Sequence, residues 1–248
     1  MSKMKIYNYQ HFMRNVIQAF KDEAFKVLKS FPEFTEEYEK IFHVEAVPSA
    51  VIFIEDEIIN IKDKKNFTRK FIINTYNDGV LMRATTPCKA HMYSKTDDDG
   101  KLKIVELCIR INYDVLLVDA IKHLHEITEY IDVVIKDHAR HEAGHIIDYI
   151  KTYPGQPVEK LQKDTEQYAK DSNEWLEWWK SISDNGTKRL TKEQDKERLI
   201  KYFSMPTEAL ADKYGGVNRE KNIDYILSKV DQVVDIVIKS KARSIEEK

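Results

Sequence analysis

The sequence predicts an α+β protein in which an N-terminal helix and a small, mostly antiparallel sheet precede a run of helices. Three observations predict this class. Apolar residues recur at helical spacing over residues 9–31, short segments rich in Val, Ile, Phe and Tyr fill residues 50–112, and helical periodicity returns after residue 114. Strands and helices that are segregated in this way along a chain are typical of an α+β fold.

The N-terminal helix is predicted by a repeated apolar face and by the proline that follows it. Pro32 ends the helix, because proline disfavours a helical conformation in the residue before it. The apolar face consists of Phe12, Val16, Phe20, Ala24, Val27, Leu28 and Phe31. Beyond it, we expect strands within residues 50–61, 71–76 and 80–86.

A β-hairpin is predicted next, with residues 91–93 in one arm, a turn at 96–100 and residues 102–112 in the other arm. In the second arm apolar and polar residues alternate, which is typical of an antiparallel or edge strand with one buried face. We expect a buried face of Val105, Leu107, Ile109 and Ile111, and a solvated face of Glu106, Cys108 and Arg110.

The rest of the chain is predicted to be helical, with segments near 114–124, 127–152, 160–182, 191–215 and 218–242. The segment 160–182 carries Tyr168, Trp175, Trp178 and Trp179, which we interpret as packing between lobes rather than as a ligand cage. We expect one catalytic domain with two lobes, an α+β lobe over residues 1–152 and a helical lobe over 153–248.

Charge and cysteine content narrow the classes of partner and location. The net charge of −2 and the absence of a basic patch argue against nucleic acid and anionic membranes as partners. Cys88 and Cys108 are too few for a disulfide framework, and we expect both thiols to be free. Neither a secretion signal nor a membrane span is recognised, so the predicted location is cytoplasmic.

The strongest chemical signal is His141-Glu142-Ala143-Gly144-His145 within the predicted helix 127–152. Histidines four residues apart leave one face of a helix and can share a metal ion. Glu142 then lies beside the ion, where it can hold a water molecule for attack on a carbonyl group. The spacing therefore predicts a zinc site with Glu142 as the general base.

The surrounding helix supports this interpretation because its residues are sorted between two faces. His141, His145 and Asp148 lie on one side. The opposite, apolar side consists of Ile135, Ala139, Ala143, Ile146, Ile147 and Ile150. Gly144 costs about 1 kcal/mol relative to Ala in a helix, which indicates that another backbone packs closely there.

A catalytic zinc needs a third protein ligand, and Glu208 is the candidate that we favour. Pro206 marks the first turn of a helix on which Glu208 and Asp212, four residues apart, share a face. Asp212 can accept the free N–H of a ligand histidine and so fix its tautomer. Asp148 and Cys108 remain alternative third ligands.

His141-Glu142-x-x-His145 followed by Glu208-x-x-x-Asp212 resembles the gluzincin group of zinc metallopeptidases, and the segment 141–148 is similar to the anthrax lethal-factor type. The resemblance implies a zincin-like fold, His141, His145 and Glu208 as ligands of one zinc ion per chain, and Tyr202 as a transition-state stabiliser. It also implies that the strand 102–112 pairs with an extended substrate. Tyr202 lies one residue closer to Glu208 than in that family, and the likeness covers only about 20 residues.

These features together predict a zinc-dependent metallopeptidase that acts on a protein or peptide through a zinc-bound water and Glu142. Two alternatives remain open at the level of sequence. One is a binding or regulatory protein that keeps the fold without catalysis, and the other is a zinc hydrolase of a non-peptide amide. The sequence does not predict the oligomeric state.

Overall fold

The structure is a computed structural model. It describes residues 4–47, 51–57, 68–73, 87–112, 127–183, 190–225 and 227. The predicted strand at 80–86, the predicted helix at 114–124 and most of the predicted helix 218–242 lie outside these residues. Within the described ranges, no helix combines the length and apolar character that a membrane span needs.

The central sheet has three strands in the order β1-β5-β4, and a separate hairpin pairs β2 with β3. β1 runs parallel to β5, whereas β4 and β5 form the predicted antiparallel hairpin. The strands are β1 (Phe42–Val47), β2 (Val51–Glu57), β3 (Thr68–Ile73), β4 (Cys88–Thr96) and β5 (Leu102–Asn112). β1 directly follows the short helix Glu36–Ile41 and was not predicted from the sequence.

Helices make up most of the remaining described chain, so the predicted α+β class is confirmed. They are α1 (Met4–Lys29), α2 (Glu36–Ile41), α4 (Ile127–Tyr130), the π-helical segment η2 (Ile131–Ile135), α5 (Lys136–Thr152), α6 (Val158–Ser183), α7 (Lys192–Phe203) and α8 (Pro206–Gly215). Residues 219–225 are also helical.

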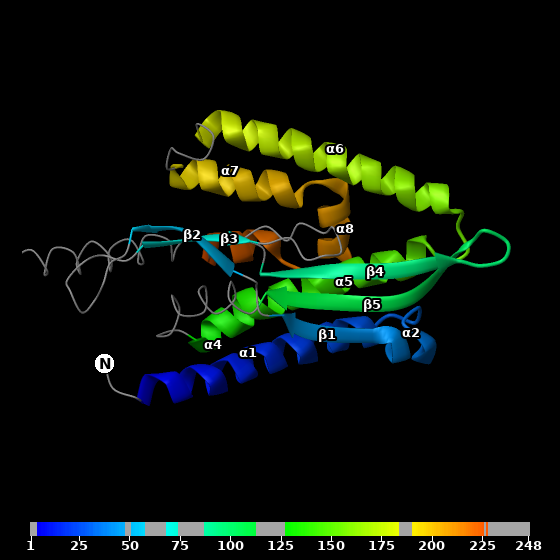
Figure 1. Cartoon of the computed structure of the whole chain (residues 1–248), viewed down its shortest axis with the longest axis horizontal. Helices are drawn as coiled ribbons and strands as arrows, with labels where there is room; N and C mark the ends of the chain where they lie inside the picture. Colours follow the sequence, from blue (N-terminus) through cyan, green and yellow to red (C-terminus); the bar gives the residue numbers. More distant parts are fainter. Residues whose placement is uncertain are drawn as a thin grey trace, which may run out of the picture.

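The predicted helical stretch 191–215 consists of two helices, and the helix start predicted at Pro206 is confirmed. α7 begins with a capping box in which Thr191 and Gln194 bond each other's backbone N–H groups. Its C-cap is Ser204, and Pro206 starts α8 at the position where a missing N–H costs nothing. The break turns α8 away from α7, as Figure 1 shows.

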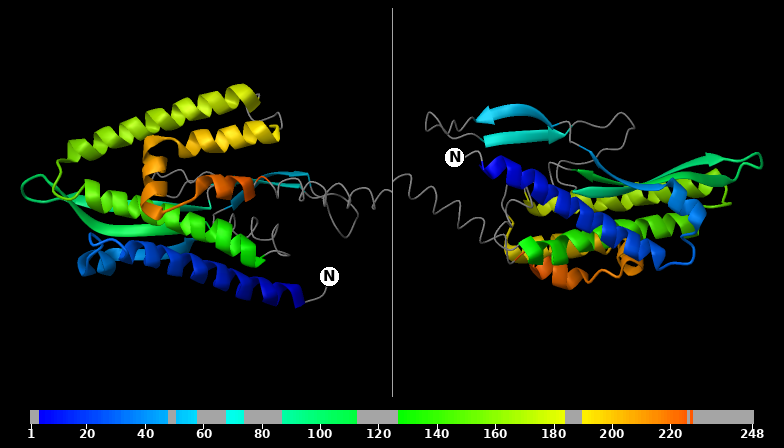
Figure 2. Two further views of the ribbon diagram at one scale, coloured as in Figure 1. Left: turned by 180° about the vertical axis from the view of Figure 1, so that it is seen from behind. Right: turned by 90° about the horizontal axis from the view of Figure 1, so that it is seen from below.

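The main core lies between α1, the central sheet and α5. Figure 2 shows α1 and α6 on opposite sides of α5. The predicted apolar side of the metal-motif helix is confirmed, since all its members are buried: Ile135, Ala139, Ala143, Ile146, Ile147 and Ile150.

The predicted alternation along β5 is wrong at two positions. Tyr93 pairs with Glu106 and Ser94 with Ile104, so Val105 is the extra residue of a β-bulge. The bulge shifts the alternation by one residue, which buries Ile104 and leaves Val105 at 38% exposure. Cys108 keeps its place opposite the apolar face but is fully buried rather than solvated.

β5 is also not an edge strand, because it lies between β1 and β4. Among the described strands of this sheet, β4 is the outer one on the side of α6 and α8 (Figure 1). An extended chain could therefore pair with β4 but not with β5.

Candidate metal centre

The metal motif lies in the middle of α5, which is covered on both sides. His141, Glu142 and His145 are each less than 10% exposed. The sheet and α1 pack on the apolar side of α5, and α8 packs on the side that carries the two histidines. A buried polar face needs partners of its own, because unpaired polar groups cost free energy away from water.

Two glycines allow α8 to come this close to α5. A Cβ atom at Gly144 would overlap the backbone of Ala211, and one at Gly215 would overlap the backbone carbonyl of Arg140. Both helices therefore touch through backbone atoms. This contact explains the glycine that the sequence placed in mid-helix, and it brings Glu208 over the two histidines.

His141, His145 and Glu208 form a buried group that can hold a metal ion, with one ligand atom of each residue within 4.8 Å of the others. Glu208 Oε2 lies 3.0 Å from His141 Nε2 and 3.7 Å from His145 Nε2. Two imidazole nitrogens and one carboxylate oxygen are a donor set that suits zinc. The residues present therefore fit the ion that the motif predicts.

Asp212 lies behind His141, where the sequence analysis expected it. His141 Nδ1 and Asp212 Oδ1 are 2.7 Å apart, so the imidazole is held at both of its nitrogens. Arg219 in turn holds Asp212, donating from Nε to Oδ2 at 2.8 Å and from Nη2 to Oδ1.

Arg219 was not predicted as part of the site. Its guanidinium carbon lies 3.5 Å from the centre of the Phe203 ring, which packs edge-on against His141. The left-handed Gly216 ends α8 and reverses the chain, which brings Arg219 back to Asp212. The Gly215-Gly216 pair predicted a turn, but nothing in the sequence indicated which side chain after the turn would contact Asp212.

Hydrogen bonds set the protonation of the centre in the absence of a metal. Burial raises the pKa of Glu208, but hydrogen bonds from His141 and His145 outweigh it and hold the pKa well below its ordinary value. Burial lowers the pKa of His141, yet its hydrogen bonds to Asp212 and Glu208 raise it to about 9. Without a metal, His141 therefore keeps a proton at neutral pH, and its charge together with that of Arg219 opposes the two carboxylates of Glu208 and Asp212.

Glu142 points to β4 rather than to the group of three. The Ala90 N–H donates to Glu142 Oε2 at 2.6 Å, and the Cys88 Sγ–H donates to Oε1 at 3.5 Å. Burial and the nearby Glu142 carboxylate raise the pKa of Cys88, which keeps this thiol protonated. The carboxylate of Glu142 is therefore held from the outer strand of the sheet.

Two tyrosines approach Glu208 from the helical part of the chain. Tyr168 donates its hydroxyl proton to Glu208 Oε1 at 3.0 Å, and Tyr202 hydrogen-bonds Tyr168. Tyr202, predicted as a stabiliser of the transition state, thus stands one hydrogen bond behind Tyr168. Tyr168 was assigned to packing, because periodicity along α6 gives no sign of a partner on α8.

The alternative third ligands do not join the centre. Asp148 accepts a hydrogen bond from Thr152 Oγ1 at 3.0 Å, and Cys108 belongs to another group, with His43 and Glu45. The tryptophans of α6 were predicted to pack between the two lobes, but the contacts of Trp175 lie within the helical part of the chain. Trp175 stacks on Trp179 and meets the edge of Tyr202 on α7.

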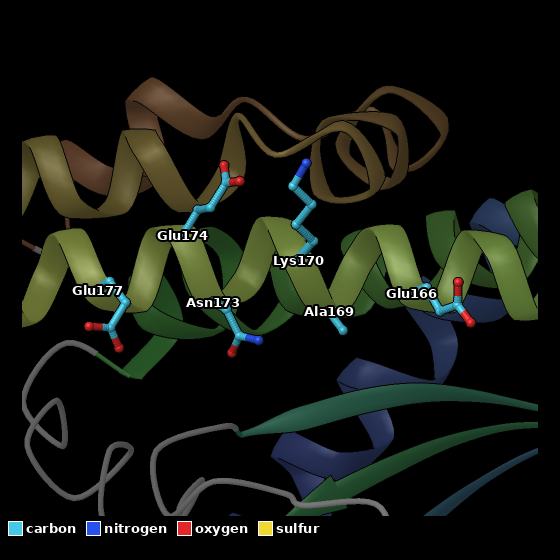
Figure 3. A pocket seen from close by; sticks show the side chains of 6 residues that line it. All are labelled: Glu166, Ala169, Lys170, Asn173, Glu174 and Glu177. Carbon is cyan, nitrogen blue, oxygen red and sulfur yellow. The ribbon is translucent and has the colours of Figure 1, made fainter.

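A hollow of about 710 Å³ lies along α6, outside the group of three. In Figure 3, Lys170 and Glu174 project to the side of α7, whereas Asn173 and Glu177 project to the opposite side. Its described lining comes from α6 alone, so it contributes no residue to the metal centre.

Comparison of the chain with protein-family models, with curated proteins and with solved structures finds no match.

Proposed function

We propose that this protein is a zinc metallopeptidase of the gluzincin type. The observation that carries the proposal is the buried group of His141, His145 and Glu208, with Glu142 next to it on α5 but outside the group. Three protein ligands leave one position of a tetrahedral ion open, as in catalytic rather than structural zinc sites.

A zinc ion held by these residues would supply Lewis-acid activation of water and of the substrate carbonyl. Glu142 accepts a proton from the attacking water and passes it to the nitrogen of the leaving amine. Its hydrogen bond from the Ala90 N–H fixes the carboxylate before substrate arrives. Asp212 holds the proton on His141 Nδ1 and so leaves Nε2 free to bind the ion.

A phenol group beside the centre can donate a hydrogen bond to the oxyanion that forms when the carbonyl is attacked. Tyr202 remains our candidate for this donor, and it hydrogen-bonds Tyr168, whose hydroxyl donates to Glu208. Burial, followed by the charge of Glu208, raises the pKa of both hydroxyls, so each phenol keeps its proton at neutral pH.

Protein or peptide substrates are proposed because an outer strand borders the base. The Ala90 N–H points to Glu142 and not to β5, and residues two apart on a strand direct their backbone groups the same way. An extended substrate that pairs with β4 would therefore lie next to Glu142.

The test compares wild type with Glu142→Gln on a diverse peptide library, with zinc content measured for both. Glu142→Gln keeps the size of the side chain and removes the base, and so does not touch the three ligands. We expect equal zinc in both proteins and cleavage by wild type alone. Zinc binding without cleavage by either would favour a non-catalytic binding protein, and cleavage by both would exclude Glu142 as the base.

If the substrate is a non-peptide amide, wild type will cleave no peptide in the library but will hydrolyse a small amide. Screening small amides with the same two proteins separates this alternative from a non-catalytic protein, because only a hydrolase loses activity in Glu142→Gln.

A further inference from the structure

A second group of potential ligands lies on the central sheet, away from the centre on α5. Side chains of a strand alternate between its two faces, and Leu107, Ile109 and Ile111 of β5 belong to the core beneath α5. Glu106, Cys108 and Arg110 of β5 therefore face the other way.

β1 brings two further ligand types to this outer face. His43 pairs with Cys108 in the parallel ladder, and Glu45, two residues on, pairs with Arg110. One ligand atom each from His43, Glu45 and Cys108 lies within 4.8 Å of the others. Glu106 adds a carboxylate, with Oε1 at 3.6 Å from His43 Nε2.

Burial and charge distinguish this group from an ordinary solvated surface. Cys108 is fully buried, His43 remains open to solvent, and Glu45 lies between these extremes. Arg110 pairs with Glu45, from Nε to Oε1 at 2.5 Å, and lies over the ring of Tyr93. This pairing occupies Oε1 of Glu45, so a cation would bind through Oε2.

We propose that His43, Glu45 and Cys108 form a second metal site, for a zinc-like divalent ion, with Glu106 as the fourth ligand. Imidazole nitrogen, thiolate sulfur and carboxylate oxygen are the donors that zinc accepts at four-coordinate sites. A sulfur ligand disfavours magnesium and calcium, which prefer oxygen. On binding, Cys108 releases its thiol proton to solvent and the metal takes its place on sulfur.

The site stands apart from the proposed catalytic centre, so each can be present without the other. The two groups share no residue and lie on different faces of the sheet, since Cys88 and Ala90 of β4 face α5. The proposal therefore does not depend on peptidase activity.

Cobalt(II) titration under reducing conditions tests the site, because only a thiolate ligand produces a near-ultraviolet charge-transfer band. We expect wild type to bind two cobalt ions per chain and to develop that band. Cys108→Ser should bind one ion and lose the band, whereas Cys88→Ser, the matched control, should keep it. Glu208→Ala should lose the other ion and also keep the band.

His43→Ala provides a variant that leaves the buried thiol in place, and it alters a side chain that is 46% exposed. In this variant we expect the cobalt affinity, measured from the growth of the same band during the titration, to be at least tenfold weaker than in wild type. The proposal would be overturned by a wild type without the band, by a band that persists in Cys108→Ser, or by one that His43→Ala leaves unchanged.

Discussion

His141 is the residue on which the contacts of the centre converge. Its Nε2 meets Glu208, its Nδ1 meets Asp212, and Asp212 is fixed by Arg219. A histidine held at Nδ1 by a carboxylate is oriented before metal arrives and binds as a stronger base. Affinity for metal should therefore depend on residues that never touch the ion.

Asp212→Asn should lower zinc affinity by roughly 10–100-fold, the range for such outer partners. The amide keeps the shape but weakens the charge-assisted bond to His141. Competition with a chelator measures the change. Asp224→Asn is a matched control, because Asp224 is an exposed carboxylate paired with Lys196 and should have no effect. Equal affinity in all three proteins would mean that Asp212 does not act on the metal.

Tyr168→Phe removes only the hydroxyl that bonds Glu208 Oε1. Because ligand carboxylates are themselves positioned by hydrogen bonds, zinc affinity should fall by about tenfold. Tyr153→Phe serves as the control, since its hydroxyl bonds Asp164 instead. If Tyr168→Phe binds zinc like wild type while losing activity, Tyr168 acts on the substrate, directly or by positioning Tyr202, and not on Glu208.

The stability of the metal-free protein should fall as pH rises through about 9. The raised pKa of His141 means that its protonated form is stabilised by folding. That stabilisation is fully present below the ordinary value of 6.5 and is lost as the pH passes about 9. The lowered pKa of Glu208 means that its ionised form also stabilises the folded protein. That stabilisation is present above pH 4.5 and is lost in acid.

Zinc should oppose the loss of stability at alkaline pH, because it binds the neutral imidazole of His141 and displaces its proton. The increase in Tm that zinc produces should grow between about pH 6.5 and 9. Thermal melts with and without zinc measure both trends. An increase that shrinks with pH over this interval would contradict the proton balance.

At the scale of elements, the contact between α5 and α8 decides whether the centre forms. The two helices meet where Gly144 faces Ala211 and Gly215 faces Arg140. This approach carries Glu208 from one helix to the histidines of the other. The packing of α5 on α8 at Gly144 and Gly215 should therefore affect both the stability of the fold and the binding of metal.

Gly144→Ala should destabilise the fold and weaken zinc binding together. Alanine would gain about 1 kcal/mol of helix propensity, but overpacking costs about 1–3 kcal/mol and here meets backbone that cannot rotate away. Denaturant melts and chelator competition measure the two effects. A variant that is more stable than wild type, with unchanged zinc affinity, would show that the helices are not in contact.

Helices and strands were predicted correctly where a local sequence pattern determines them. They were predicted wrongly where the pairing of distant strands determines the structure. The buried face of α5 follows from its helical period, and the β4–β5 hairpin from its turn. The bulge at Val105 and the central place of β5 depend on β1, a strand that alternation did not reveal. Burial of Cys108 has the same origin, since β1 covers it on one side.

At the scale of the whole molecule, the candidate metal ligands could be predicted from the sequence, but the residues that hold them in place could not. Spacing alone pairs His141 with His145, and the helix start at Pro206 suggested Glu208. Tyr168 and Arg219 come from segments 40 residues before Glu208 and seven after Asp212, with no shared period. Contacts between helices place Tyr168 and Arg219 at the centre, and such contacts leave no periodic pattern in the sequence.

Among the described residues, two groups of candidate metal ligands lie on different faces of the central sheet, and the group on α5 lies next to Glu142, the proposed base. We expect hydrolysis to depend on the group on α5 and not on the group that contains Cys108. Cys108→Ser should thus keep peptidase activity, whereas His145→Ala should abolish it. Activity lost in both variants would show that the outer group is needed as well.

The most direct test of the central claim is anomalous X-ray diffraction at the zinc absorption edge, on crystals grown with zinc. We predict a peak bound by His141 Nε2, His145 Nε2 and Glu208, with Glu142 close by but not coordinated. Zinc absent from these three residues, or bound with Asp148 in place of Glu208, would contradict the proposed centre.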